Sequence, residues 1–374
     1  MDVPFLDLKT QFFPLKEEIK KAIDDVFESQ IFILGSSVER FEENIGKYLR
    51  VKHAIGISSG TDALLVSLMS LNIKEGDEVI TTPFTFFATA GTIVRVGAKP
   101  VFVDIKKDFN IDEDMIEEAI TERTKAIIPV HLFGKTCSIS KIKDIAKKHS
   151  LYIIEDAAQA IGAEFNEKKV GGVGDLGCFS FFPSKNLGGI GDGGLIATNN
   201  HKLAEKIKVL RKQGMEQKNF HKYIGGNFRL DEIQASVLNI KLKHLDLWND
   251  KRIKNAEAYI NQLSNLEEKG FVSLPRSEEK NEHVFNQFTL VCKNRDKLRE
   301  FLLRKGIKTE VYYPIPLHLQ ECFKMLRYKK GDFPVAETVC ENVLSIPIYP
   351  ELTKERRDYV IDNIKEFYIG HNFR

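Results

Sequence analysis

Between residues 50 and 200 the chain alternates short apolar runs with amphipathic stretches, and this alternation constrains the fold more than any other feature. Seven apolar runs have the length of one buried strand each: HAIGIS (53–58), EVITT (78–82), KPVFVDI (99–105), KAIIPVHL (125–132), LYIIED (151–156), GCFSFF (177–182) and GGLIAT (193–198). Three stretches between them space apolar residues by three and four, as helices packed on a sheet do: TDALLVSLMSL (61–71), MIEEAITER (115–123) and ISKIKDIAKKH (139–149). The repeated order predicts an α/β fold with a mostly parallel, seven-stranded sheet flanked by helices.

After residue 200 the periodicity is helical, through residues 202–214 and again through an unusually long run at 230–263. The long run predicts a helix that connects a large domain to a smaller one. In the second part, HVFNQFTLVC (283–292) is typical of a strand and RDKLREFLLRKG (295–306) of a helix. Because 374 residues exceed the usual size of one compact core, we predict a large domain over 1–248 and a small α+β domain over 249–374.

The charge balance and the cysteines exclude several classes of protein. The 55 basic and 53 acidic residues leave a formal charge of +2, which gives no general attraction for nucleic acid or an anionic membrane. Five scattered cysteines without CxxC spacing or a histidine-rich neighbourhood predict reduced thiols and no metal site. The charged amino terminus lacks the apolar core of a signal peptide, and no segment approaches the roughly 20 apolar residues of a membrane-spanning helix. We therefore expect a cytoplasmic protein.

One lysine stands out by its position. Lys185 follows an apolar run and precedes five glycines in SFFPSKNLGGIGDGG (180–194). A lysine in such a loop is most often a solvated surface residue. Glycines, however, let the backbone approach a bulky ligand closely, and a lysine held beside that ligand can lose solvent and become nucleophilic.

A carboxylate ends another of the predicted strands. Asp156 lies at the carboxyl end of the apolar run in IIEDAAQAIG (153–162), and ligands of open α/β sheets bind outside such ends. A carboxylate there can face the nitrogen of a pyridine ring and keep it protonated. The more frequent use of Asp at such a junction is a helix N-cap. We expect Glu155, its neighbour, to point the other way.

Two further loops follow predicted strands. In ISSGTDALLVSL (57–68), Gly60 and Thr61 stand where a helix begins, and amide groups there can bind a phosphate, although Ser and Thr cap many helices for structural reasons. In TTPFTFFAT (81–89) three phenylalanines are grouped together. Most such side chains are core packing, but one of them could stack on a flat heteroaromatic ring.

The ordered set of motifs resembles the DegT/DnrJ/StrS family of fold-type I, pyridoxal-phosphate-dependent sugar aminotransferases. The resemblance runs from VPFLDLKTQF (3–12) to EVYYPIPLHLQ (310–320) and includes SGTDAL, EDAAQAIG, SFFPSKNLGGIGDGG and NFRLDEIQA. It implies pyridoxal 5′-phosphate as the cofactor, with Lys185 carrying it as a Schiff base and Asp156 paired with its pyridine nitrogen. Gln159 would lie near the ring and its 3′-hydroxyl.

The resemblance implies further cofactor contacts. Gly60, Thr61 and Ser180 would hold the phosphate, and Phe86 would stack on the ring. Asn227, in GGNFRLDEIQAS (225–236), resembles the residue that this family inserts into the phosphate site of its neighbour. Such an insertion implies a homodimer with shared active sites.

The substrate contacts are less specific. YYPIPLHLQ is similar to the segment that closes over the sugar in this family, which makes Tyr313 and His318 candidates; the alternative is a proline-rich turn with an ordinary surface histidine. Arg229 could receive the carboxylate of an amino donor or a phosphate, or it could pair with Asp231. We interpret His131, in PVHLFG, as a structural residue.

The resemblance also implies the reaction. The few family members that dehydrate their substrate carry a His where this chain has Lys185, so the lysine favours transamination. L-glutamate would be the amino donor and a nucleotide-linked keto sugar the acceptor. The lysine loop and the YYPIPLHLQ segment resemble the C3-aminating branch, so we predict a UDP-linked 2-acetamido-3-keto-hexose and a 3-amino sugar product for lipopolysaccharide, O-antigen or other surface-glycan biosynthesis.

Several alternatives stay open at this point. The acceptor could be a dTDP-linked 3-keto-6-deoxyhexose, or amination could occur at C4. A different pyridoxal enzyme, such as a dehydratase or a cysteine desulfurase-like protein, would share Asp156 and Lys185. A non-enzymatic alternative is a pyridoxal-phosphate-binding regulatory protein.

Overall fold

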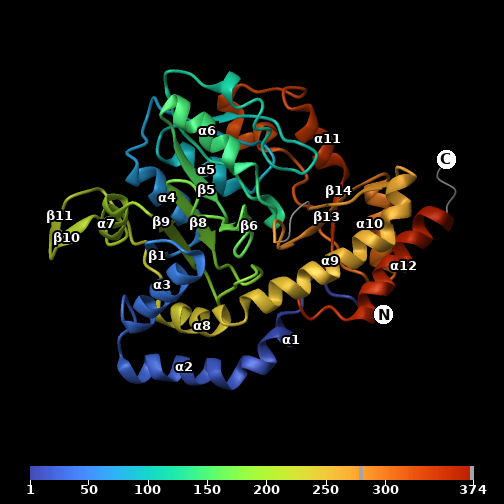
Figure 1. Cartoon of the computed structure of the whole chain (residues 1–374), viewed down its shortest axis with the longest axis horizontal. Helices are drawn as coiled ribbons and strands as arrows, with labels where there is room; N and C mark the ends of the chain where they lie inside the picture. The colour runs from blue at the N-terminus through green and yellow to red at the C-terminus, as the bar shows by residue number, and fades with distance from the viewer. Residues whose placement is uncertain (278–280, 371–374) are drawn as a thin grey trace.

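The core of the chain is one seven-stranded sheet covered by helices on both faces (Figure 1). The computed structural model describes residues 1–277 and 281–370. Every predicted apolar run supplies one strand, so the predicted sheet is confirmed. The strands, in chain order, are β1 (His53–Ile57), β2 (Glu78–Thr81), β3 (Lys99–Phe102), β4 (Thr124–Ile127), β5 (Tyr152–Asp156), β8 (Leu176–Ser180) and β9 (Gly194–Thr198).

The strand order across the sheet is β1-β9-β8-β5-β4-β2-β3. The pairs from β8 to β3 are parallel, whereas β9 pairs antiparallel with both β1 and β8. Because β9 is antiparallel to both of its neighbours, β1 runs in the same direction as β8. The carboxyl ends of all strands except β9 therefore lie at one edge of the sheet, where ligands of such sheets bind.

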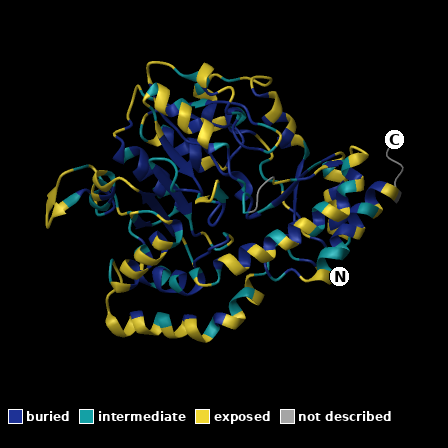
Figure 2. Ribbon diagram, viewed as in Figure 1, coloured by how far each residue is buried: buried dark blue, intermediate teal, exposed yellow. Residues whose placement is uncertain are grey.

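Helices from different parts of the chain cover the two faces. Ile154 and Cys178 pack in one apolar cluster with α4 (Gly60–Ser70), α5 (Phe87–Arg95) and α7 (His201–Leu210). Their chain neighbours Ile153 and Phe179 point to the opposite face, towards α6 (Ile139–His149), α3 (Ser36–Leu49) and α8 (Glu232–Leu242). The alternation of side chains along a strand therefore divides the core into two layers, and Figure 2 shows the strands as the buried centre.

Two helix predictions are wrong. Residues 115–123 form only a short 3-10 turn at Glu117–Ala119. Ile116 is buried but Met115 is 45% exposed. The apolar stripe that these nine residues bury is therefore too narrow to stabilise a helix. The run at 230–263 is two helices, α8 and α9 (Leu245–Glu268), separated at Lys243–His244. The break lets α8 pack on the large sheet while the later turns of α9 pack in the carboxy-terminal core.

The carboxy-terminal part is a small α+β unit, as predicted. An antiparallel sheet of β12 (Val272–Ser273), β13 (Phe288–Cys292) and β14 (Val343–Ile346) packs with α9, α10 (Arg295–Arg304) and α12 (Lys354–Gly370). Val3, at the other end of the chain, is buried in the same cluster and pairs with Ile307. The domain division at 248/249 falls inside α9 and stays a prediction.

The remaining elements lie at the periphery. They are α1 (Leu8–Phe12), α2 (Lys16–Ser29), α11 (Pro334–Asn342), and two hairpins formed by β6 (Glu164–Phe165) with β7 (Lys168–Lys169) and by β10 (Met215–Gln217) with β11 (Phe220–His221). The β10–β11 hairpin projects from the body of the molecule (Figure 1). No helix among the described residues is long and apolar enough to cross a membrane.

Candidate active site

Lys185 lies in the connection between the antiparallel strands β8 and β9, at the edge where the other strands end. The connection is closed by hydrogen bonds from the Phe181 amide to the Gly193 carbonyl (2.8 Å) and from the Lys185 amide to the Phe182 carbonyl (2.8 Å). The side chain is partly buried, and burial lowers the pKa of Lys185 to about 8, although Asp156 opposes that shift. With this pKa a fraction of the amine is neutral near pH 7, and a neutral amine is a competent nucleophile.

Helix α8 is hydrogen-bonded to the glycine-rich connection. The Ile190 amide donates to Gln234 Oε1 (2.8 Å), and Lys241 Nζ donates to the Gly188 carbonyl (2.6 Å). A Cβ atom at Gly189 would lie 2.6 Å from Gln234 Oε1, so a larger residue there would displace the Gln234 side chain. Burial lowers the pKa of Lys241 to about 8.

Asp156 ends β5 and faces the same edge. Its Oδ2 accepts a hydrogen bond from Thr89 Oγ1 (2.8 Å) and its Oδ1 accepts one from the Ala158 amide (3.2 Å). Burial raises the pKa of Asp156, while the Thr89 bond, the Ala158 bond and the charge of Lys185 oppose that shift. No helix begins after Asp156, so the N-cap alternative does not apply.

Glu155 points to the opposite side of β5, as expected for adjacent residues of a strand. It is fully buried and accepts hydrogen bonds from the amides of Gly171 (2.8 Å) and Gly174 (2.6 Å). Its Oε2 lies 3.0 Å from His131 Nε2, whose other ring nitrogen accepts from the Cys137 amide. Glu155 and His131 therefore hold loops together and do not face the ligand edge.

The candidate phosphate residues Gly60, Thr61 and Ser180 lie where α4 begins and β8 ends. Gly60 and Thr61 form the first turn of α4, and a Cβ atom at Gly60 would lie 2.7 Å from the Ser180 Cβ. A Cβ atom at Gly194 would lie 2.3 Å from the Ser59 carbonyl oxygen. The start of α4 and the end of β8 are thus in direct contact, and their amides and hydroxyls offer the donors that a phosphate dianion needs.

Arg229 lies along the outer side of β1. Its backbone pairs with Ile57, and the Ser58 amide donates to the Phe228 carbonyl (3.0 Å). The Nε of Arg229 is buried without a hydrogen-bond partner. Within residues 1–277 and 281–370 no ion pair joins Arg229 to Asp231.

Asn227 is exposed and its backbone pairs with Lys212. It follows the β10–β11 hairpin, whose Phe220 is 70% exposed and is followed by Ile224, 92% exposed. A contact of Asn227 with the phosphate site of a second copy stays a prediction.

Aromatic side chains form one wall of the site. Phe86 is 56% exposed, and its ring centroid lies 6.4 Å from that of Tyr313, whereas Phe84 is core packing. Gln159 Nε2 donates to the Tyr313 hydroxyl (3.2 Å), and Gln159 Oε1 accepts from the Phe133 amide (2.7 Å). Gln159 and Tyr313 are therefore fixed together, and an exposed ring face is left at Phe86.

His318 is placed differently from Tyr313. It is 2% exposed, its Nε2 lies 3.0 Å from Glu337 Oε1, and its ring packs edge-on against Phe333. Its Nδ1 is buried without a partner, and burial lowers its pKa. It is not an ordinary surface histidine, and a contact of His318 with the sugar stays a prediction.

These residues fit pyridoxal 5′-phosphate. A nucleophilic amine, a buried acid, a helix start with adjacent hydroxyls and an exposed aromatic ring come from four separate loops and meet at one edge of the sheet. A sequence profile of the DegT/DnrJ/EryC1/StrS aminotransferase family matches residues 14–365. The chain belongs to this family. The resemblance recognised in the motifs is thus confirmed.

Known relatives of this DegT-family chain match it over almost its whole length. A pleiotropic regulatory protein of Geobacillus stearothermophilus is 50% identical over 98% of this chain and 99% of its own. A UDP-N-acetyl-3-dehydro-α-D-glucosamine 3-aminotransferase of Acidithiobacillus ferrooxidans is 44% identical over 95% of both chains. A dTDP-3-amino-3,4,6-trideoxy-α-D-glucose transaminase of Streptomyces venezuelae is 40% identical over 98% of this chain and 96% of its own.

Solved structures agree with the family assignment. DesV of S. venezuelae, in complex with a ketimine intermediate, has a TM-score of 0.95 at 40% identity and matches over 98% of both chains. NtdA of Bacillus subtilis with bound cofactor PMP has a TM-score of 0.92 at 36% identity, over 98% of this chain and 85% of that one. The fold-type I architecture, the pyridoxal-phosphate cofactor and the class of enzyme, a sugar aminotransferase, are confirmed.

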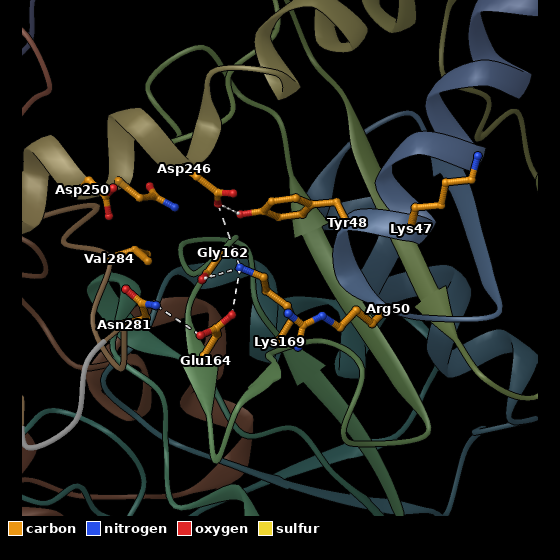
Figure 3. A pocket seen from close by; sticks show the side chains of 11 residues that line it. Lys47, Tyr48, Arg50, Gly162, Glu164, Lys169, Asp246, Asp250, Asn281 and Val284 are labelled. Atoms are coloured by element: carbon orange, nitrogen blue, oxygen red, sulfur yellow. Dashed lines mark hydrogen bonds and ion pairs between the residues drawn. The ribbon is translucent and has the colours of Figure 1, made fainter.

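A polar pocket of this DegT-family chain lies away from these residues (Figure 3). It has a volume of about 440 Å³ and is lined by residues such as Tyr48, Glu164, Lys169 and Asp246. None of the predicted site residues lines it.

Sequence reasoning missed three residues that shape the site. Thr89 donates to Asp156, and Gln234 and Lys241 support the lysine connection. Thr89 stood in the motif considered for its phenylalanines, and the other two lie inside a helical run. Only the fold brings them to the site.

Proposed function

We propose that the chain transfers an amino group from L-glutamate to a nucleotide-linked 3-keto sugar, with a UDP-linked 2-acetamido-3-keto-hexose as the favoured acceptor. The product would be a 3-amino sugar for surface-glycan biosynthesis. The observation that carries the proposal is the placement of Lys185 and Asp156 at one edge of the sheet, close enough for each charge to influence the pKa of the other.

The residues at this edge divide the work. Pyridoxal 5′-phosphate, when bound, supplies an aldehyde and an electron-accepting ring. The neutral amine of Lys185 would hold the aldehyde carbon and, once displaced by the amine of the donor, would take a proton from the substrate carbon and return it. The half-buried position and the lowered pKa of Lys185 suit both tasks.

The other side chains would orient the ligand. Asp156, as a carboxylate, would accept a hydrogen bond from the protonated ring nitrogen, and Phe86 would cover one face of the ring. Gly60, Thr61 and Ser180 would bind the phosphate through amides and hydroxyls. Arg229 Nε, buried without a partner, would receive the carboxylate of the donor or the phosphate.

The choice of acceptor rests on the relatives. The 44% identical relative is named for a UDP-linked 3-dehydro sugar, and the 40% identical one for a dTDP-linked 3-amino sugar. Both names place the nitrogen at C3. The higher identity supports the UDP-linked acceptor, and the dTDP-linked 3-keto-6-deoxyhexose is the second candidate.

A spectroscopic titration with substrates tests the function. The purified protein is loaded with pyridoxal 5′-phosphate, and its absorbance band near the visible edge is followed as L-glutamate is added. We expect the band to bleach and to return with a UDP-linked 3-keto sugar, with the aminated product identified by its mass. Return with a dTDP-linked or a 4-keto sugar alone would contradict the favoured acceptor. A band that glutamate never bleaches would indicate a binding protein.

The attachment site has its own test. Reduction of the loaded protein with borohydride, followed by proteolysis and mass analysis, should place the cofactor on the peptide that contains Lys185. Label on Lys241, the other buried lysine near this connection, would contradict the assignment.

We also propose a homodimer in which Asn227 completes the site of a second copy. The exposed Phe220 and Ile224 beside Asn227 support a protein contact there. Lys185→Ala and Asn227→Ala chains are mixed under conditions that allow exchange. If the sites are shared, each mixed dimer has one intact site, and up to about a quarter of native activity returns. No recovery after demonstrated exchange would place Asn227 in the site of its own chain.

A further inference from the structure

A pair of buried hydroxyls stands behind Asp156. Thr89, in the first turn of α5, is fully buried, and its Oγ1 lies 2.8 Å from Asp156 Oδ2. Thr85, in the loop before α5, is 2% exposed, and its Oγ1 lies 3.1 Å from Thr89 Oγ1. The three side chains form a row that ends at Asp156.

The protons of this row have one consistent order when Asp156 is charged. A carboxylate can only accept, so the Thr89 hydroxyl donates its single proton to Asp156. The Thr89 oxygen is then free to accept the proton of Thr85. Each hydroxyl in such a chain polarises the next, which strengthens the bond to the charged acid.

Thr89 does not behave as an ordinary threonine of a helix. Thr92, in the same helix and equally buried, donates to the Ala88 carbonyl of the preceding turn (2.9 Å), which is the usual bond for a helical hydroxyl. Thr89 stands in the first turn of α5, so no carbonyl of a preceding helical turn is available to it. Its hydroxyl bonds Asp156 of β5 instead.

We propose that Thr89, supported by Thr85, is a positioning residue of the cofactor site that orients the Asp156 carboxylate and keeps it charged opposite the ring nitrogen. The proposal rests on the role proposed above for Asp156. Among the described residues, no other side chain donates a hydrogen bond to this carboxylate; the second donor is the Ala158 amide.

The surroundings of Asp156 support this task. Burial raises the pKa of Asp156, and the Thr89 bond is the largest effect that opposes it. The ionisable groups that face Asp156 from the neighbouring elements are Lys185, His131, Cys178 and Tyr313. Burial raises the pKa of both Cys178 and Tyr313, which keeps them uncharged at neutral pH. His131 already pairs with Glu155. The hydrogen bond from Thr89 therefore stabilises the charged form of Asp156 without passing through any of these groups.

The test measures cofactor affinity as a function of pH in the full-length protein stripped of cofactor. The variants are Thr89→Val, which keeps the shape but removes the hydroxyl, Thr89→Ser, which restores it, and Thr92→Val as the matched control. Pyridoxal 5′-phosphate is titrated into each, and the dissociation constant is read from the absorbance of the bound form.

We expect Thr89→Val to bind the cofactor about tenfold more weakly near neutral pH. Removing the hydroxyl raises the pKa of Asp156, so affinity should decline on acidification at a pH about one unit higher than in the native protein. Thr89→Ser should recover both properties, and Thr92→Val should retain the native profile. Thr85→Val should shift the profile in the same direction by less.

A uniform loss of affinity at every pH in Thr89→Val, without displacement of the profile, would show a packing role and overturn the proposal. If Thr89→Val does not fold, Thr85→Val decides, and a native profile there overturns it. Asp156→Ala separates this inference from the proposed function. Native affinity and profile in Asp156→Ala would refute the assigned site itself, whereas loss there with a native profile in Thr89→Val would refute only the inference.

Discussion

The cofactor edge and the pocket of Figure 3 are both rich in charged side chains, but they treat those charges in opposite ways. In the pocket, Lys169 Nζ lies 3.1 Å from Glu164 and 4.7 Å from the centre of the Tyr48 ring, and the Tyr48 hydroxyl donates to Asp246 (2.6 Å). At the cofactor edge, the Lys185 amine forms no hydrogen bond or ion pair within the described ranges. Charged side chains without partners, rather than the volume of a pocket, therefore distinguish the candidate ligand site.

The physical reason is the free energy of desolvation. A partly buried charge without a partner is unfavourable, so a fold keeps one only where a ligand supplies the missing contact or the neutral form is needed. The Tyr48–Lys169 group needs neither, because its members satisfy each other. It joins α3, the β6–β7 hairpin and the start of α9.

Replacing Lys185 and Lys169 separately by alanine is the strongest test of the difference between unpaired and paired charges. We expect Lys185→Ala to reduce turnover by at least about a thousandfold, because it removes both the attachment point and the proton carrier. Lys169→Ala should leave turnover within about twofold of native. Turnover of an amino donor and keto sugar under saturating conditions is the measurement. Comparable losses in both variants would contradict the distinction between paired and unpaired lysines.

The neighbouring carboxylates extend the comparison to stability. Glu155→Ala leaves three backbone amides and His131 without their buried acceptor, so we expect the free energy of unfolding to fall by about 3 kcal/mol. Urea denaturation of the purified protein measures it. Glu43→Ala, which removes an exposed ion pair with Lys47, is the control and should not change the midpoint. An unchanged midpoint in Glu155→Ala would show that the buried acid does not hold the loops.

The pH dependence of cofactor attachment sharpens the assignment of the amine. The pKa of Lys185 is lowered to about 8, and only the neutral amine attacks an aldehyde. The attachment rate in stripped protein should therefore rise about tenfold per pH unit below that value and level off above it. An ordinary exposed lysine would continue to gain rate beyond pH 10. Stopped-flow absorbance separates the two curves.

The smallest effect is expected at the polar pocket. Tyr48→Phe removes the hydrogen bond to Asp246 and should lower the free energy of unfolding by about 0.5 kcal/mol, without changing turnover. Thermal denaturation and the substrate assay measure both. A clear loss of turnover would reveal a catalytic role for a pocket that we assign to structure.

The strands and the main ligand positions could be predicted from the sequence because their causes are local. An apolar run bounded by loops identifies a strand, and a polar residue at its carboxyl end, such as Asp156, is then placed by the common direction of the strands. Lys185 was found through its glycines, which allow the backbone to approach a bulky ligand closely. These signals need no knowledge of distant contacts.

The remaining features depend on partners far away in the sequence. The break between α8 and α9 arises because the two helices pack in different cores, which no local pattern records. The partnership of Thr89 with Asp156 spans 67 residues, and a threonine in an apolar helix carries no sign of it. Lys241 was equally hidden, because a lysine in a helix is usually solvated.

The reversal of β9 has a mechanical consequence. Since Lys185 lies in a connection whose two ends are hydrogen-bonded into adjacent strands, its backbone has little freedom to move. Any movement of the Lys185 amine must therefore come from rotation about the bonds of its own side chain. We therefore expect loop insertions between residues 181 and 193 to be tolerated poorly, and gating of the site to depend on segments outside this tether.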